Sequence, residues 1–133
     1  MSTPKTDKMV FVFGSNEVGA HGAGAARFAQ LNRGAVFGKS YGHYGNSFAI
    51  PTKDEYIETM PLDRIRQYVE GFLAYAKGHR KVKFQVTAIG CGLAGYKHED
   101  IAPMFRMAPS NCYFDIQWEP WLGKDHNYWG SYE

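Results

Sequence analysis

The sequence is poor in cysteine and has no long apolar run, and these two absences exclude whole classes of protein. Two cysteines among 133 residues, Cys91 and Cys112, are too few for a disulfide framework and lack the paired Cys/His spacing of a zinc site. We therefore expect free thiols, no metal and no cofactor. No apolar run approaches the roughly 20 residues that span a bilayer, so we expect no membrane contact.

A signal-like segment and an excess of charge are missing as well. Residues 1–8 are polar and lack the apolar core of a signal peptide, which favours a cytoplasmic protein. We expect these residues to form a disordered leader and residues 9–133 to form a single domain, because 133 residues fit one domain. A net charge of +2 argues against broad nucleic-acid binding but leaves room for a small anionic ligand.

Glycine is abundant, and one glycine-rich stretch organises the chain. Residues 88–96, Ala-Ile-Gly-Cys-Gly-Leu-Ala-Gly-Tyr, follow a run over 82–87 that predicts a buried strand, and they precede residues 97–101, which predict the start of a helix. Glycine lets the backbone approach a ligand closely, and N–H groups beside a helix N-terminus bind anions, most often phosphate. The alternative is a tight turn that holds no ligand.

A second glycine-rich stretch, residues 14–30, follows an apolar run over 9–13 that predicts a strand buried on both faces. It leads into a helix that begins among small residues. Its glycine spacing matches neither a phosphate loop ending in Gly-Lys-Ser/Thr nor the dinucleotide fingerprint. Asn16 and His21 are the polar side chains most able to act here. The alternatives are a turn residue for Asn16 and a solvated side chain for His21.

The next predicted strand places a lysine at a candidate site. Residues 34–45 are rich in turn residues and predict a surface loop. Residues 47–50 predict a short strand that ends at Pro51, because proline removes a ladder donor. Lys53 then lies at a strand end, where the sites of α/β sheets gather. Its amine can bind phosphate or, if desolvated, act as a nucleophile; the alternative is an exposed structural lysine.

The remaining patterns complete an α/β chain. Apolar residues at spacings of three and four predict a helix over 61–77, and residues 101–107 also predict a helix. Residues 112–118 predict the last strand. The C-terminal segment that follows is unusually aromatic, with large rings at Trp118, Trp121, Tyr128, Trp129 and Tyr132. We expect this aromatic segment to pack over the sheet; an oligomer interface and stacking on a base are the alternatives.

Taken in order, these motifs resemble a macro domain, the module that binds ADP-ribose. The resemblance covers the chain from residue 9 to about residue 118. It rests on residues 21–26 (His-Gly-Ala-Gly-Ala-Ala), 50–53 (Ile-Pro-Thr-Lys) and 89–96 (Ile-Gly-Cys-Gly-Leu-Ala-Gly-Tyr). It implies an α/β fold, namely a three-layer α/β/α sandwich with a mixed central sheet. The small size is also similar to that of compact macro-like proteins carried by bacteriophages.

The resemblance implies roles for both glycine-rich loops. The loop over residues 22–26 would flank the ribose and phosphates, and the loop over residues 90–96 would hold the diphosphate, with Asn16 and Tyr96 near the distal ribose. The implied ligand-binding residues are Gly22, Ala23, Gly24, Ala25, Gly90, Cys91, Gly92, Leu93, Ala94, Gly95 and Tyr96.

The motif around Lys53 is similar to the macro-domain branch of terminal ADP-ribose glycohydrolase and the DNA ADP-ribosyl glycohydrolases. A lysine of that branch follows a strand in a Pro-Thr-Lys context and attacks the anomeric carbon as an amine. The resemblance implies that Lys53 and Asn16 are catalytic. Two positions depart from the pattern: Ala94 stands where the protein glycohydrolase has an acid, and Gly14 and Ser15 stand where a base-binding acid is sought.

Three functions follow as expectations. The first is hydrolysis of an ADP-ribosyl linkage, with ADP-ribose or an ADP-ribosylated macromolecule as partner. The second is binding without catalysis, as in a sponge for an ADP-ribose-derived nucleotide signal that a phage would direct against a host defence. The third is a structural domain that forms a homo-oligomer through the aromatic C-terminal segment.

Overall fold

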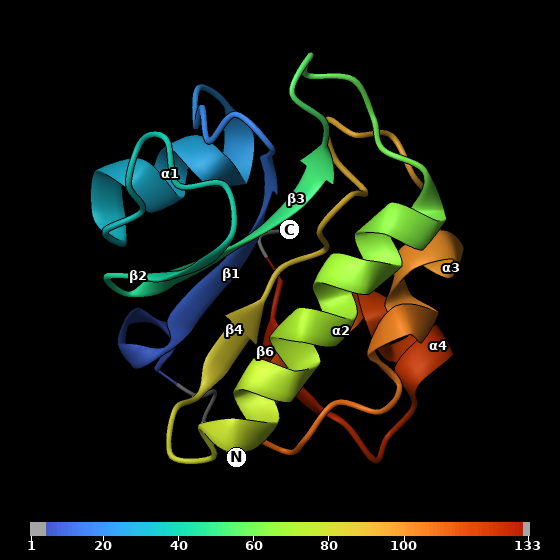
Figure 1. Cartoon of the computed structure of the whole chain (residues 1–133). Coiled ribbons are helices and arrows are strands. Elements are labelled where there is room, and N and C mark those ends of the chain that lie inside the picture. Colours follow the sequence, from blue (N-terminus) through green and yellow to red (C-terminus); the bar gives the residue numbers. More distant parts are fainter. Residues whose placement is uncertain (1–4, 132–133) are drawn as a thin grey trace.

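A six-stranded mixed sheet carries the fold in the computed structural model, which describes residues 5–131 (Figure 1). The strands follow the spatial order β2-β3-β1-β4-β5-β6. In chain order the elements are β1 (Val10–Asn16), α1 (Gly24–Asn32), β2 (Gly42–Tyr44), β3 (Ser47–Lys53), α2 (Leu62–Gly78), β4 (Phe84–Val86), α3 (His98–Ile101), β5 (Cys112–Asp115), α4 (Glu119–Leu122) and β6 (Asn127–Gly130). Single 3-10 turns add Thr6–Lys8, Ala102–Phe105 and Ile116–Trp118.

Five of the six strands run in the same direction. β1 pairs in parallel with β3 and β4, β4 with β5, and β5 with β6, whereas β2 pairs antiparallel with β3. The carboxyl ends of the five parallel strands therefore meet at one edge of the sheet. The mixed sheet was predicted, and the prediction is confirmed.

Helices cover both faces of the sheet, which confirms the predicted three layers. Val10 and Val12 of β1 pack in one core cluster with Ile65 and Val69 of α2. Phe11 and Phe13 of β1 pack in a second, smaller cluster with Ala26 and Ala29 of α1. Successive strand residues point to opposite faces, so α1 and α2 lie on opposite faces, as Figure 1 also shows.

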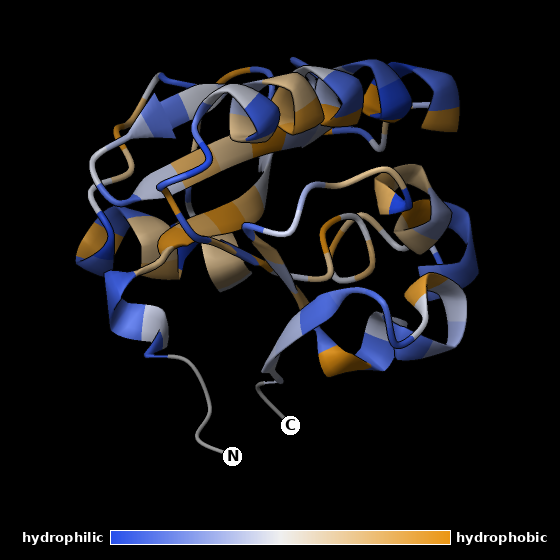
Figure 2. Ribbon diagram, turned by 90° about the horizontal axis from the view of Figure 1, so that it is seen from below, coloured by the Kyte–Doolittle hydropathy of each residue, from blue (hydrophilic) through white to orange (hydrophobic). Residues whose placement is uncertain are grey.

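The helix α2 forms because its apolar residues recur on one face. Ile65, Val69, Phe72 and Ala76 are spaced by four, three and four residues, and all are fully buried. Burying each of the three larger side chains contributes about 1.5–3 kcal/mol. Figure 2 shows the central strands in hydrophobic colours, while α2 alternates hydrophobic and hydrophilic residues. The predicted helix over 61–77 is thus confirmed to within a residue.

The end of β3 corrects one sequence prediction. The strand does not end before Pro51 but continues through it to Lys53. On one side β2 pairs no further than Ala49, so no strand there needs a donor from Pro51. On the other side Pro51 lies beside Ser15 of β1. The predicted surface loop over 34–45 likewise contains the short strand β2 at its end.

The last predicted strand is too long, and a further strand was missed. β5 ends at Asp115, whose carboxylate accepts a hydrogen bond from the Gln117 N–H and starts a 3-10 turn. The aromatic segment then forms α4 and β6, and β6 extends the sheet. Trp118 and Trp129 are buried, which confirms the predicted packing for these two rings. Tyr132 lies outside the described residues.

The structure describes the N-terminal segment from residue 5 onward. Residues 1–4 of the predicted leader lie outside the described residues, while Thr6–Lys8 forms a 3-10 turn and Met9 is buried. Within residues 5–131, no helix combines the length and apolar character that crossing a membrane requires.

Candidate functional site

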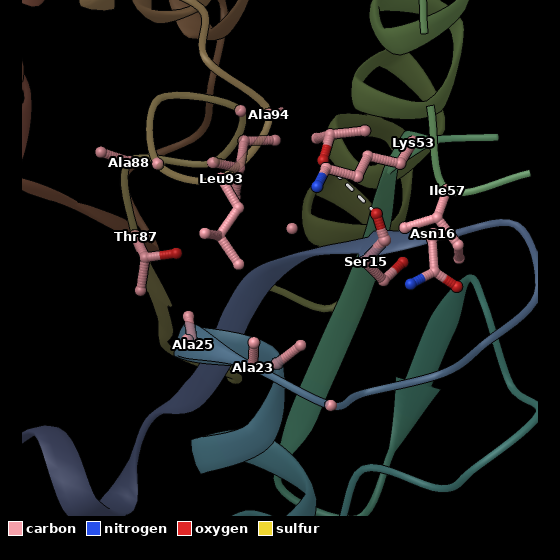
Figure 3. A pocket seen from close by; sticks show the side chains of 18 of the residues that line it. Ser15, Asn16, Ala23, Ala25, Lys53, Ile57, Thr87, Ala88, Leu93 and Ala94 are labelled. Atoms are coloured by element: carbon pink, nitrogen blue, oxygen red, sulfur yellow. Dashed lines mark hydrogen bonds between the residues drawn. The ribbon is translucent and has the colours of Figure 1, made fainter. Parts of the chain in front are cut away.

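A cavity of about 710 Å³ opens at the carboxyl ends of the parallel strands (Figure 3). This volume lies in the range of small-molecule sites. Every parallel strand contributes to its lining, at or just beyond the strand's end. The contributions are Ser15 and Asn16 from β1, Thr52 and Lys53 from β3, Thr87 after β4, Asp115 from β5 and Ser131 after β6.

The position of the cavity follows from the topology. β1 and β4 are neighbours, yet the chain leaves β1 toward α1 on one face and leaves β4 toward α3 on the other. Such a switch point separates the two loops and opens a crevice where open α/β sheets bind ligands. The residues that line it from the two sides come from these two connections: Ala23–Ala26 on one side, and Gly90, Gly92, Leu93 and Ala94 on the other.

The N-terminus of α1 forms one wall. Gly22, Ala23, Gly24 and Ala25 line the cavity; that they bind a ligand stays a prediction. No side chain caps this helix, and its first turn contains no acid. The first N–H groups of a helix have no partner within it, and small side chains leave them accessible. This wall can therefore accept an anion.

The loop between β4 and α3 forms the opposite wall through Gly90, Gly92, Leu93 and Ala94. Gly90 has φ +75°, and a side chain there would meet Ile101 at 3.2 Å, so this position requires glycine. The Tyr96 N–H donates to the Gly90 carbonyl at 2.8 Å and closes the turn. The loop presents its backbone to the cavity because its glycines fold it tightly.

Three residues of the predicted binding set do not line the cavity: Cys91, Gly95 and Tyr96. Cys91 packs against the larger core cluster, and burial raises the pKa of its thiol to about 12. The Tyr96 hydroxyl donates to the Met60 carbonyl at 2.7 Å and ties the loop to the segment before α2. Cys91 and Tyr96 thus hold the loop in place.

Asn16 lines the cavity but uses its amide within its own loop. Its Oδ1 accepts from the N–H groups of Gly19 and Ala20 at 2.9 and 3.1 Å, and its Nδ2 donates to the Ala20 carbonyl at 2.7 Å. The turn role that the sequence allowed is confirmed by these bonds. A catalytic role for Asn16 stays a prediction.

Lys53 lies at one end of the cavity together with Ser15, Asn16 and Ile57 (Figure 3). Its carbonyl accepts from the Glu17 N–H at 2.9 Å, which fixes the backbone at the end of β3. The lining contains a single cation, Lys53, and a single acid, Asp115, among the residues that the structure describes. An anionic ligand that enters here therefore meets Lys53 as its cationic partner.

His21 corrects another prediction. It was expected to be solvated if it did not act on a ligand, but only 4% of the residue is exposed. Its Nε2 lies 3.2 Å from the Val36 carbonyl, and its ring packs edge-on against Phe13. Its Nδ1 finds no hydrogen-bond partner within residues 5–131. His21 does not line the cavity and instead anchors the loop before α1 to the segment before β2.

The sequence missed the polar residues at the far end of the cavity. Asp115 is 4% exposed and accepts from the Gln117 N–H at 2.9 Å and from the Ser131 hydroxyl at 3.4 Å. All three residues line the cavity. Asp115 was read as the interior of a long strand, and Ser131 follows a strand that was not predicted. The one sequence signal for this part of the site was an acidic residue, Asp115, directly after the apolar residues of a predicted strand.

No metal centre emerges from the side chains. Within residues 5–131, no group of three or more His, Cys, Asp or Glu residues is placed to hold a metal ion. Cys91 and Cys112 are free thiols. The chemistry of the cavity therefore rests on backbone N–H groups, hydroxyls, Lys53 and Asp115.

Fold and cavity together define an α/β protein with a ligand-sized crevice at a switch point of a mixed sheet. No protein-family model matches the chain, and no curated protein matches it. A solved structure, that of a protein of unknown function from Bacteroides thetaiotaomicron, is similar with a TM-score of 0.46 and 17% sequence identity over 74% of this chain and 79% of that one. This similarity carries no argument about function, and the resemblance to macro domains stays a prediction.

Proposed function

We propose that this protein binds ADP-ribose or a related nucleotide diphosphate in the cavity and hydrolyses an ADP-ribosyl linkage there. The observation that carries the proposal is a single cavity that joins an uncapped helix N-terminus, a glycine loop, a lysine and a buried carboxylate. The resemblance of the three sequence motifs to those of macro domains supports the same ligand.

The diphosphate is assigned to the middle of the cavity, between α1 and the loop over Gly90–Ala94. Backbone N–H groups on both walls bind phosphate oxygens without requiring net positive charge. The macrodipole of α1 adds about 0.3–1 kcal/mol for each favourable charge at an exposed end, and more at a partly buried one. The absence of acid from the first turn of α1 keeps this attraction uncancelled.

The two ends of the cavity fit two different groups. Lys53 on β3 and Asp115 on β5 are three strand positions apart in the order β3-β1-β4-β5. Neighbouring strands lie about 4.8 Å apart, which places these strand ends roughly 14 Å from each other. An extended nucleoside diphosphate sugar spans this separation. At one end of the cavity, the Asp115 carboxylate accepts a hydrogen bond from the amino group of adenine. At the other end, the terminal ribose lies beside Lys53.

Hydrolysis assigns Lys53 the role of nucleophile. The Nζ of Lys53 attacks the anomeric carbon of the terminal ribose, a nitrogen–carbon bond forms, and the bond from that carbon to the modified group breaks. The departing group takes up the proton that the amine loses. Water then cleaves the lysine adduct and releases ADP-ribose with the amine regenerated.

Binding without turnover is a second candidate, and one observation favours it. Ala94 lines the cavity at the position where the glycohydrolase that the motifs resemble has an acid, and the acid in the lining, Asp115, lies three strand positions from Lys53. A general acid beside the leaving group is therefore missing from the described lining. Under this second candidate function, the protein sequesters an ADP-ribose-like nucleotide.

Calorimetry with free ADP-ribose, followed by a turnover assay on an ADP-ribosylated substrate, tests both candidate functions. We expect micromolar binding by the unaltered chain. For the hydrolase, Lys53→Ala abolishes release of ADP-ribose, and Lys39→Ala, which removes a lysine outside the cavity lining, leaves it unchanged. Retained turnover in Lys53→Ala excludes the lysine mechanism, binding without any turnover establishes the second candidate, and no binding refutes both.

A further inference from the structure

Ile57 has the most unusual backbone conformation in the cavity lining. Its φ is +63°, and it is the one non-glycine residue with positive φ among residues 5–131. A β-branched side chain in this region is a true outlier, since its Cβ crowds the neighbouring carbonyl. Such strain persists only where the surroundings impose it, and it gathers at ligand sites.

Asp54 imposes this conformation through its side chain. The carboxylate Oδ1 accepts from the N–H groups of Tyr56 and Glu58 at 2.8 and 3.0 Å. The Asp54 backbone adds two bonds: its carbonyl accepts from the Ile57 N–H at 3.1 Å, and its N–H donates to the Glu58 carbonyl at 2.8 Å. The turn is therefore fixed on both sides of Ile57.

Neither the turn nor the core explains an isoleucine at this position. Glycine or asparagine adopts positive φ at lower cost, and 46% of Ile57 is exposed, so core burial is incomplete. Its side chain instead lines the cavity, beside Lys53 and Asn16 (Figure 3). An exposed aliphatic group is thus held against the polar end of the site.

We propose that Ile57 determines specificity by packing against the carbon face of a terminal pentose ring at the Lys53 end. The proposal rests on the proposed function, and it names the part of the ligand that this end selects. A furanose offers hydroxyls at its edge and carbon atoms on its face. Ile57 covers that face and excludes water from the space beside the Lys53 amine. A nucleotide that ends at the second phosphate does not reach this wall.

Calorimetry with two nucleotides tests the inference. ADP-ribose carries the terminal ribose, and ADP lacks it. We expect the unaltered chain to bind ADP-ribose more tightly than ADP. Ile57→Ala and Ile57→Gly each weaken ADP-ribose binding about tenfold, the equivalent of one aliphatic contact, and leave ADP binding unchanged. Met107→Ala, at an aliphatic residue that is 89% exposed and outside the cavity lining, changes neither.

Thermal unfolding of the two variants tests the strain separately. Both remove the side chain, but alanine keeps the cost of positive φ and glycine does not. We expect Ile57→Gly to melt about 3 °C above Ile57→Ala, with both variants equally impaired in ADP-ribose binding.

An unaltered preference for ADP-ribose over ADP in Ile57→Ala overturns the inference while leaving the proposed function intact. An equal loss of ADP and ADP-ribose binding overturns it as well, because Ile57 would then act on the whole cavity. An unaltered chain that binds neither nucleotide refutes the proposed function and this inference together.

Discussion

Two glycine-rich connections in this protein look alike in sequence but present different groups to the cavity. The first connects β1 to α1, a helix of nine residues that begins without a side-chain cap and without an acid. The second connects β4 to α3, a helix of four residues with Glu99 and Asp100 in its first turn. Asp100 also accepts from the Lys97 N–H at 3.1 Å. The positive end of α1 is open, whereas that of α3 is met by the chain's own carboxylates.

The difference shows that a glycine loop before a helix does not by itself identify which groups bind an anion. At the first connection the helix N-terminus lines the cavity, and at the second the loop does so while the helix start, Lys97–Asp100, does not. In our proposal, therefore, the phosphates bind the N–H groups of Gly24–Ala26 and of the loop residues that line the cavity, Gly90 and Gly92–Ala94, and not those of α3.

The largest expected effect comes from placing an acid at the open helix end. Ala25 is exposed and lines the cavity in the first turn of α1. Ala25→Asp repels a diphosphate and occupies the N–H groups, so we expect ADP-ribose affinity to fall about 100-fold while the helix gains about 0.3–1 kcal/mol from the favourable charge. Calorimetry and thermal unfolding measure the two effects.

A charge-matched variant controls for the change in net charge. Gln30→Glu adds the same charge at an exposed position on α1 outside the cavity lining, and we expect binding within twofold of the unaltered chain. Equal losses in both variants would mean that net charge, and not the helix end, controls binding.

Substituting Asp115 should cause the next largest loss of affinity, because in our proposal its carboxylate binds the amino group of the base. Asp115→Asn keeps an oxygen for the Gln117 N–H but replaces an acceptor with a donor. We expect about a tenfold loss of ADP affinity and a smaller loss for inosine diphosphate, whose base carries a carbonyl in place of the amino group. Competition binding with the two nucleotides measures the ratio. An unchanged ratio would place the base elsewhere.

The same reasoning predicts a small effect at α3. Glu99→Gln removes a carboxylate from the first turn of the capped helix, which does not line the cavity. We expect ADP-ribose affinity to change by less than twofold, because screening weakens interactions between separated exposed charges. A tenfold gain in affinity would show that α3 also faces the phosphates and would remove the contrast between the two connections.

The Cys112 thiol should make stability depend on pH only in alkali. Burial raises the pKa of Cys112 from its ordinary value to about 12. A thiol whose pKa is higher in the folded chain stabilises the fold below the unfolded pKa of about 9, and this contribution is lost as pH rises toward 12. We expect the free energy of unfolding to fall from pH 8 to pH 10, and less steeply in Cys112→Ala. Urea titrations of both proteins at the two pH values measure this fall. An equal fall in the unaltered chain and in Cys112→Ala would contradict the role given to the Cys112 thiol.

The sequence predicted the parts of the fold that local patterns determine. The α2 helix followed from the spacing of Ile65, Val69 and Phe72, and the two loops followed from their glycines. β3 was predicted too short because the cost of Pro51 depends on where its partner β2 ends. β6 was missed because its aromatic residues belong to a strand only when β5 is beside them.

The candidate site was predicted in the same uneven way. Lys53 and the small residues of α1 line one cavity, and local patterns pointed to them because strand ends and helix starts can be recognised in the sequence. Their binding and catalytic roles stay predictions. Asp115 and Ser131 were not found, because their meeting depends on the pairing of β5 with β6. Ile57 gave no sequence signal at all, since its conformation is imposed by the turn that Asp54 forms.

An NMR titration of the isotopically labelled chain with ADP-ribose tests the contrast between the two connections most directly. We predict large changes in amide chemical shift at Gly24, Ala25 and Ala26 and in the loop over Gly90–Ala94, with little change at His98–Asp100 at the start of α3. Saturating shifts at α3 without shifts at α1, or no shifts at either wall of the cavity, would contradict the account.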